Sequence, residues 1–356
     1  MIRSALASLS RRALPALGRD PRPDEVRHSP QYREGRFRNT DRPRTSAAEA
    51  PSGATIREFL FGGERRTPSA PVPLVGAVKP AADPVMPGGL HITWYGHASA
   101  LVEIDGHRVL IDPIWSDRPS PVPMVGPRRL HPVPHQLSDV GRIDAVLISH
   151  DHYDHLDLPT VRALLRDQAA PFVVPIGVGA HLRHWNVPES RIVELDWHEH
   201  VELGALRLTA TPAQHFSGRT LARDTTLWTS WAIRVGERAV FYSGDTGYCA
   251  AFAEIGERYG PFDATLIQIG AYDAAWPDIH MTPEEGVSTH LDVRGEVLIP
   301  VHWGTFNLAM HSWSDPVDRA WRESKAREIT LAVPRPGERI DVDDPPEVDG
   351  WWQAYA

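Results

Sequence analysis

The sequence predicts an α/β protein in which helices cover β-sheets. Two observations favour this class: short apolar runs with strand composition recur between residues 91 and 301, and helix-start signals stand between several of them. Strands and helices that alternate along one chain pack as layers. The chain has 356 residues, of which 42% are hydrophobic. This length and composition suit one large domain or two smaller ones, and they exclude wholesale disorder and a fibrous repeat.

Composition divides the chain into three regions. Residues 1–88 are rich in Arg, Pro, Ser and Ala, and their Pro-interrupted runs suit neither helices nor central strands. We expect a partly irregular N-terminal arm that packs on the core or contacts a membrane, with short helices at residues 2–14 and 55–61. A poorly ordered tail at the start of the arm is the alternative. Residues 89–345 are expected to form the main domain and residues 346–356 a C-terminal tail.

The main domain begins with three predicted strands. Residues 92–95 and 100–104 are the first two, and the pair Asp105-Gly106 separates the second from residues 108–111. An Asp-Gly pair between two such runs is a strong hairpin signal.

A Pro-rich loop is expected at residues 113–135, followed by an apolar strand at residues 143–148 that is buried on both faces. Asp157 then caps a helix that carries Pro159 in its first turn. In the second half, a helix is expected at residues 283–289. Further strands are expected at residues 206–209, 228–234, 239–242, 265–269 and 296–301.

Charge and cysteine content exclude several classes of protein. The formal net charge is −9, although residues 1–50 carry 11 Arg against 6 acidic residues. The remainder is therefore strongly acidic, and nucleic acid is not an expected partner. The single cysteine, Cys249, excludes an internal disulfide framework and a multi-cysteine zinc site.

The N-terminal residues decide little about location. We expect no membrane-spanning helix, because no apolar stretch reaches about 18 residues. Arg11 and Arg12 interrupt the apolar run of a secretory signal, whereas an Arg- and Ser-rich transit peptide stays open. We expect a cytoplasmic protein, with peripheral membrane contact as an alternative. The oligomeric state is undecided, and a homodimer is compatible with the sequence.

The segment at residues 149–155 is the most informative about function. It directly follows a buried strand and holds His150, His152, Asp154 and His155, four potential metal ligands. Imidazole and carboxylate groups without thiolates suit zinc, iron or manganese. One buried His is commonly a hydrogen-bonded core residue, but so dense a set would pack poorly without a cation.

Later strand ends are expected to supply more ligands, because one turn cannot complete two coordination spheres. The candidates are His215, Asp245 and His302, each of which follows an apolar strand and stands close to Gly or Pro. Taken alone, each would more often be structural. Loops at strand ends are nevertheless where sites in α/β proteins usually occur.

Together these residues resemble the five-motif metal site of the metallo-β-lactamase superfamily. The resemblance covers residues 91–310 and implies an αββα four-layer sandwich, here with an N-terminal extension. Further motifs resemble the N-acyl-phosphatidylethanolamine phospholipase D branch. They are Trp94-Tyr95-Gly96-His97-Ala98-Ser99, Ile111-Asp112-Pro113-Ile114-Trp115-Ser116, Gly126-Pro127-Arg128-Arg129, Leu195-Asp196-Trp197, Pro212-Ala213-Gln214-His215, Gly244-Asp245-Thr246-Gly247-Tyr248, Ile269-Gly270-Ala271-Tyr272 and His302-Trp303-Gly304-Thr305-Phe306.

The resemblance implies a centre of two zinc ions, for which iron or manganese would be alternatives. The implied ligands are His150, His152 and His215 for one ion, Asp154, His155 and His302 for the other, and Asp245 between the two. Residues behind the ligands are expected to orient the imidazoles. Asp112, at a strand end, is our candidate for this role, and His97 either shares it or is simply packed.

Two such ions that share a water would lower its pKa, so a bridging hydroxide would be the nucleophile and no Ser or Cys would be needed. The resemblance implies a phospholipid or small phosphodiester substrate, with N-acylethanolamine and phosphatidic acid as products. The predicted catalytic set is Asp154, Asp245 and His280. His280 is the candidate proton donor or polar clamp at the leaving group, against the alternative of a surface His before a helix.

A lipid substrate would need an apolar approach surface. Residues 122–125, Leu60-Phe61 and the apolar face of residues 2–9 are candidates, unless they pack the arm onto the core. Three other functions stay open. They are a lactonase-like hydrolase of a small lactone, ester or cyclic phosphate, a metal-dependent nuclease, which the acidic charge disfavours, and a non-catalytic metal-binding module.

Overall fold

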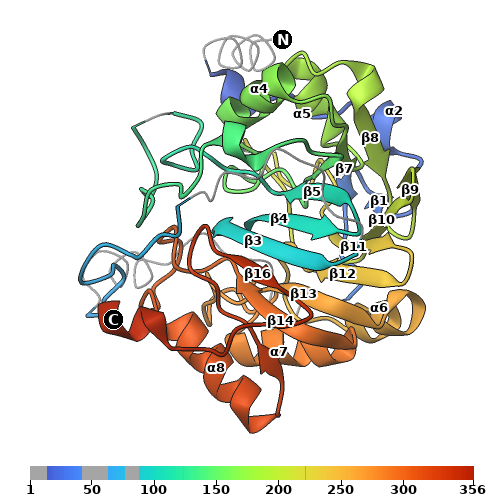
Figure 1. Ribbon diagram of the computed structural model, residues 1–356. Helices are drawn as coiled ribbons and strands as arrows, with labels where there is room; N and C mark the ends of the chain where they lie inside the picture. The colour runs from blue at the N-terminus through green and yellow to red at the C-terminus, as the bar shows by residue number, and fades with distance from the viewer. Residues whose placement is uncertain (1–13, 42–62, 77–87, 123, 221) are drawn as a thin grey trace.

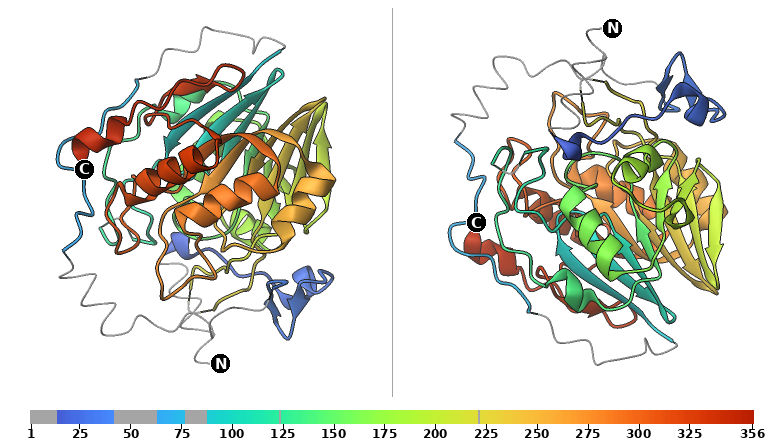
Figure 2. Two further views of the ribbon diagram at one scale, coloured as in Figure 1. Left: turned by 90° about the horizontal axis from the view of Figure 1, so that it is seen from below. Right: turned by 90° about the horizontal axis from the view of Figure 1, so that it is seen from above.

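Two β-sheets lie face to face in the computed structural model, which describes residues 14–41, 63–76, 88–122, 124–220 and 222–356. Over these residues each sheet has seven strands. Helices cover the outer faces, with α4 and α5 on one side and α6, α7 and α8 on the other (Figure 1). Figure 2 shows the same layers from below and from above. The predicted αββα four-layer sandwich is confirmed.

The first sheet carries the early strands of the main domain. Its antiparallel part contains the predicted hairpin, in which Asp105 and Gly106 have φ values of 40° and 85°. These left-handed conformations are what a two-residue hairpin turn requires. The strand order is β16 (Arg339–Asp341), β3 (Leu90–Gly96), β4 (Ser99–Ile104), β5 (His107–Ile111), β6 (Ala145–Leu147), β7 (Phe172–Pro175) and β8 (Ile192–Leu195).

The second sheet is built from the later strands, of which β12, β13, β14 and β15 run parallel to one another, while β12 is antiparallel to β11. The carboxyl ends of parallel strands meet at one edge, where functional loops gather. The strand order is β15 (Thr330–Leu331), β14 (Gly295–Val301), β13 (Phe262–Gln268), β12 (Arg238–Tyr242), β11 (Ser230–Val235), β10 (Leu206–Thr211) and β9 (His200–Leu203).

Two of the helices begin as the sequence predicts. Asp157 caps α4 by accepting a hydrogen bond from the backbone N–H of Thr160, and Thr282 caps α7 by accepting from that of Glu285. The described helices are α2 (Pro23–Val26), α4 (Leu158–Asp167), α5 (Gly179–His184), α6 (Ala251–Tyr259), α7 (Pro283–Asp292) and α8 (Asp315–Ala326), with short 3-10 turns η1 (Pro15–Leu17), η2 (Leu137–Val140), η3 (Glu189–Arg191) and η4 (Trp351–Tyr355).

The largest apolar core lies between the two sheets and under α6, α7 and α8, and a second one lies under α4 and α5. Residues at the end of the chain join the larger core, where Trp352 is fully buried. The segment expected to be a tail therefore packs against the domain. Helices α5, α6 and α8 lie outside the segments for which the sequence predicts helices.

The described part of the arm packs on the domain. It forms a hairpin of β1 (Tyr32–Arg33) and β2 (Arg36–Phe37). Phe37 is 1% exposed and belongs to an apolar cluster with Trp228. Apart from Leu14, the helices expected at residues 2–14 and 55–61 lie outside the described residues, as do Leu60 and Phe61. No helix in the described ranges is both long and apolar enough to cross a bilayer.

Candidate metal centre

The His-rich turn follows β6 and brings three imidazoles together. His150 Nε2 lies 2.8 Å from His152 Nδ1, and His215, which follows β10, places its Nε2 3.3 Å from the same His152 nitrogen. The ligand atoms of these three residues all lie within 4.8 Å of one another. The structure thus brings together the first predicted ligand group from two loops far apart in the sequence.

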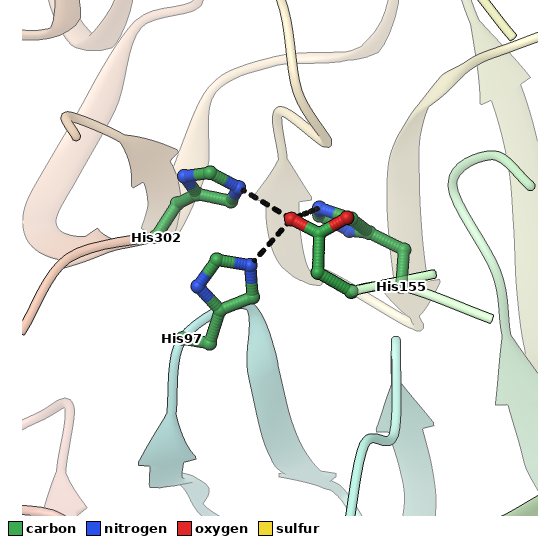
Figure 3. Close-up of side chains that lie close together, drawn as sticks. His97, His155 and His302 are labelled. Atoms are coloured by element: carbon green, nitrogen blue, oxygen red, sulfur yellow. Dashed lines mark hydrogen bonds and ion pairs between the residues drawn. The ribbon is translucent and has the colours of Figure 1, made fainter. Parts of the chain in front are cut away.

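A second group surrounds Asp154. Figure 3 shows the rings of His97, His155 and His302 turned toward one carboxylate oxygen, which the distances identify as Oδ2 of Asp154. His97 Nε2 lies 2.9 Å away, His302 Nε2 3.5 Å and His155 Nε2 3.6 Å. This group contains the second predicted ligand set, and it adds His97.

Asp245, at the end of β12, lies between the two groups. Its Oδ2 is 3.1 Å from the Nε2 atoms of both His155 and His302. The same oxygen is 3.9 Å from the Nε2 atoms of His150 and His215. One carboxylate oxygen therefore faces imidazoles from both groups, which is the position expected of a residue shared by two cations.

Asp112 orients the cluster from behind. It is fully buried, and its Oδ2 accepts hydrogen bonds from His155 Nδ1 at 2.7 Å and from Tyr242 OH at 2.5 Å. Its Oδ1 accepts from the backbone N–H of Ser149 at 2.7 Å. Because Nδ1 of His155 is engaged, its Nε2 points into the cluster. Such contacts fix the tautomer and direction of a ligand imidazole.

His97 does more than fill space. Its Nε2 contacts Asp154 and its ring centroid lies 4.0 Å from that of His302. The backbone N–H of His97 donates to Thr305 Oγ1 at 2.6 Å, and its carbonyl accepts from the N–H of His302. Of the two sequence interpretations, the contacts favour a residue that holds Asp154 in place.

Charge and burial in the cluster suit a cation. Burial lowers the pKa values of His150 and His215, so both imidazoles are neutral and able to bind a metal. Burial opposes ionisation of Asp245, but His155 and His302 outweigh it and hold the carboxyl pKa well below its usual range. Within the described residues, His155 Nε2, His302 Nε2 and Asp245 Oδ1 are buried without a hydrogen-bond partner. Buried polar atoms normally have partners, so these atoms fit metal ligands.

His280 lies beside the ligands and not on the open surface. Its Nε2 is 4.0 Å from Asp245 Oδ2, and its ring centroid is 5.2 Å from that of His215 and 5.3 Å from that of His302. Burial lowers the pKa of His280 to about 3. The imidazole is therefore neutral at neutral pH, which favours the polar clamp over an imidazolium proton donor.

A cavity of about 200 Å³ opens onto the cluster. Its polar floor consists of residues of the cluster, and its walls are largely apolar. The lining residues are His152, Asp154, Phe216, Asp245, Ala271, Trp276, Ile279, His280, His302 and Leu308. A second cavity of about 250 Å³ shares Phe216, Trp276 and Ile279 with it and extends toward the arm.

The sequence predicts no supporting role for Asp151 or Arg219. Asp151, inside the His-rich turn, points away from the cluster, toward His181 Nε2 at 3.1 Å and the N–H of Gly218 at 2.7 Å. Arg219 is 4% exposed and donates to the carbonyls of Asp151 and Leu156. Their loops carry no periodic pattern, so nothing in the sequence marked them. A third supporting residue, Asn39, is described below; it stands in Gly35-Arg36-Phe37-Arg38-Asn39, a segment with a weak resemblance to the N-acyl-phosphatidylethanolamine phospholipase D branch.

Comparison with known proteins agrees with this fold. A family model described as a beta-lactamase superfamily domain matches residues 107–303. An uncharacterized protein of Mycobacterium tuberculosis is 49% identical over 329 residues, which cover 91% of this chain and 88% of that protein.

Two further similarities bear on activity. N-acyl-phosphatidylethanolamine-hydrolyzing phospholipase D 1 of Caenorhabditis elegans is 36% identical over 253 residues, covering 67% of this chain and 71% of its own length. A solved metallo hydrolase from the archaeon Ignicoccus hospitalis aligns with a TM-score of 0.57 and 25% identity, over 71% of this chain and 98% of that chain. The chain therefore belongs to the metallo-β-lactamase superfamily and is a metal-dependent hydrolase of that fold.

Proposed function

We propose that this protein is a dinuclear zinc hydrolase that cleaves phosphodiesters in the manner of an N-acyl-phosphatidylethanolamine phospholipase D. The position of Asp245 Oδ2, between two groups of imidazoles, carries the proposal. The similarity to the worm enzyme supports the substrate class, because its name states that reaction. The products would be an N-acylethanolamine and phosphatidic acid.

Seven side chains would hold the two ions. His150, His152 and His215 would bind one, Asp154, His155 and His302 the other, and Asp245 both. Imidazole and carboxylate donors without thiolate suit zinc, and also accept iron or manganese. When bound, the ions supply Lewis acidity and positive charge for hydrolysis of a phosphodiester.

The protein's own groups would position the substrate around that centre. Asp112 and His97 keep His155 and Asp154 directed at the centre. The neutral His280 imidazole, close to Asp245, would give one N–H to an oxygen of the leaving group. Hydrogen bonds of this kind are worth more in a cavity that excludes water.

The walls of the cavity favour a lipid over a small polar substrate. Phe216, Trp276, Ile279 and Leu308 stand around the cluster, and no Arg lines this cavity over the described residues. Such apolar walls would accept chains of a lipid, whereas a small anionic substrate would need a polar cup. We extend the proposal to peripheral membrane contact through the Pro-rich loop, in which Met124 is 84% exposed.

The test of the proposed function is an assay of purified protein with measured metal content. The substrates are N-acyl-phosphatidylethanolamine in vesicles, an aryl phosphodiester, a lactone and a β-lactam. We expect N-acylethanolamine to be released from the vesicles only by the metal-loaded protein. Activity confined to the lactone or the β-lactam would overturn the phosphodiester assignment and leave the family unaffected.

Replacing His280 by Ala is expected to slow turnover by about 100-fold, the scale for losing one oriented donor at a reacting oxygen. Zinc content should stay at the wild-type value, because none of the seven proposed ligands is altered. Turnover and bound zinc are measured on the same sample. Wild-type turnover in the variant would remove His280 from the mechanism.

Zinc affinity is expected to rise with pH between 6.5 and 9. Burial disfavours the His302 imidazolium, but the carboxylates of Asp245 and Asp154 raise its pKa from 6.5 to about 9. Zinc must displace this proton, so protons compete below pH 9 and cease to compete above it. The same ion pairs stabilise the zinc-free fold below pH 6.5, and this contribution is lost as pH rises through 9. Chelator competition at several pH values measures the effect, and a flat profile would contradict it.

A further inference from the structure

We propose that Asn39, in the N-terminal arm, positions His215 for metal binding. This inference rests on the proposed function, in which His215 is a zinc ligand. The side-chain amide of Asn39 pairs with both backbone groups of His215. Its Nδ2 donates to the His215 carbonyl at 2.9 Å, and its Oδ1 accepts from the His215 N–H at 3.1 Å.

The orientation of the Asn39 amide is determined by a third partner. The indole Nε1 of Trp228 donates to Asn39 Oδ1 at 2.9 Å, and Trp228 is 2% exposed. Two N–H donors therefore face one amide oxygen and one carbonyl faces the amide nitrogen. A flipped amide would set nitrogen against both donors, so Asn39 has a single favourable orientation.

His215 needs this support because it lies beyond the end of β10. The sheet pairing of β10 with β11 ends at Thr211, and the isolated bridge between Gln214 and Gly247 stops one residue before His215. Across the described residues, both hydrogen bonds of the His215 backbone go to Asn39. A buried peptide group without a partner is costly, and Asn39 replaces the missing strand.

The fixed backbone directs the His215 ring. Nδ1 of the ring pairs with the Ile279 carbonyl at 2.9 Å, which leaves Nε2 free to point toward His152. The ring is thus held at its backbone by Asn39 and at its far side by Ile279. Asn39 is not in contact with the imidazole, so its role is positioning through the main chain.

The arm that carries Asn39 lies outside the matched family domain, which begins at residue 107. It is nevertheless docked firmly next to the site. Phe37 is 1% exposed and its N–H donates to the Asp224 carbonyl at 2.9 Å. The arm therefore contributes to the candidate metal centre and is more than a cover on the core.

Replacing Asn39 by Ala is expected to weaken binding of one of two zinc ions by about 10- to 100-fold, the range for losing a partner that supports a metal ligand. Asn39→Asp keeps the acceptor for the His215 N–H but sets a carboxylate oxygen against the His215 carbonyl, so we expect a loss there too. The matched control is Asp41→Ala. Asp41 is two residues further along the arm, and its Oδ2 accepts from the backbone N–H of Ala250 at 3.1 Å without touching a histidine.

The experiment measures stepwise zinc affinities by chelator competition in the full chain, together with the unfolding temperature of each zinc-free protein. We expect the weaker affinity in both Asn39 variants and wild-type affinities in Asp41→Ala. If the Asn39 variants bind both zinc ions with wild-type affinity, the inference is overturned and the proposed function stays intact. An equal loss in Asp41→Ala would also overturn it, since arm docking in general would then be the cause. A wild-type chain that binds no zinc would overturn the proposed function and this inference together.

Discussion

Asp245→Ala is expected to abolish metal binding and hydrolysis together. Asp245 Oδ2 faces the Nε2 atoms of His155 and His302 at 3.1 Å, so its removal takes a ligand from both proposed ions. It also removes the carboxylate oxygen closest to the Nε2 atoms of these two imidazoles, which then face only Asp154 at 3.5 to 3.6 Å. Loss of a partner behind a ligand costs about 10- to 100-fold in affinity. We expect a larger loss here, more than about 100-fold, because a shared ligand disappears.

Metal content by elemental analysis and turnover of the phosphodiester are measured on the same preparations. The surface variant Asp344→Ala, which also removes one carboxylate, should keep both at wild-type values because Asp344 is exposed. Asp245→Ala protein that is folded, carries two zinc ions and turns over normally would contradict the proposed centre. If the variant loses turnover but keeps its full metal content, Asp245 acts in the reaction and not in metal binding, which would contradict its role as a shared ligand.

Arg219→Ala is expected to produce the largest loss of stability among these variants. The Arg219 side chain donates to the carbonyls of Ala16, Asp151 and Leu156 at 2.6 to 3.0 Å. Its guanidinium carbon lies 4.1 Å from the centroid of the Tyr153 ring. The substitution leaves three carbonyls without a donor and creates a cavity. Each unsatisfied buried group costs about 1–3 kcal/mol, so we expect a loss of about 3 kcal/mol.

A loss of this size corresponds to a fall in Tm of roughly 5 °C for a large domain. Because Asp151 lies inside the His-rich turn and Leu156 directly follows it, zinc affinity should fall as well. The control is Arg207→Ala, which removes an exposed ion pair with Glu202, and exposed pairs contribute about 1 kcal/mol or less. Equal Tm values for the two variants would contradict the expected contribution of Arg219 to stability.

Local pattern was sufficient for much of the fold. The Asp105-Gly106 turn and the Asp157 cap are short-range signals whose geometry depends on neighbouring residues, and both occur as predicted. The strand at residues 143–148 is shorter in the structure, Ala145–Leu147, although the N–H groups of Asp144 and Ile148 still donate to the neighbouring strands β5 and β7. Helices such as α8 were missed because their apolar stripe is narrow between many charged residues.

For the candidate site, too, some residues could be predicted from local pattern and others could not. The dense group from His150 to His155 is contiguous in the sequence, so residue type and spacing are enough to predict that it binds a metal. His215, Asp245 and His302 were recognised by resemblance and by their place after strands, and the structure brings them to the cluster. Their convergence supports the proposed ligand set.

The α/β class follows from short-range pattern in the sequence alone, whereas the family and the proposed set of metal ligands were predicted by resemblance. Only the tertiary structure decided which groups support that set. Asn39 lies 176 positions from His215, and Arg219 joins the arm at Ala16 to the His-rich turn. Each of these contacts joins a polar side chain to a backbone group, and every residue possesses such backbone groups. A sequence carries no signal for them, since only the packing of distant segments determines which carbonyl meets which donor.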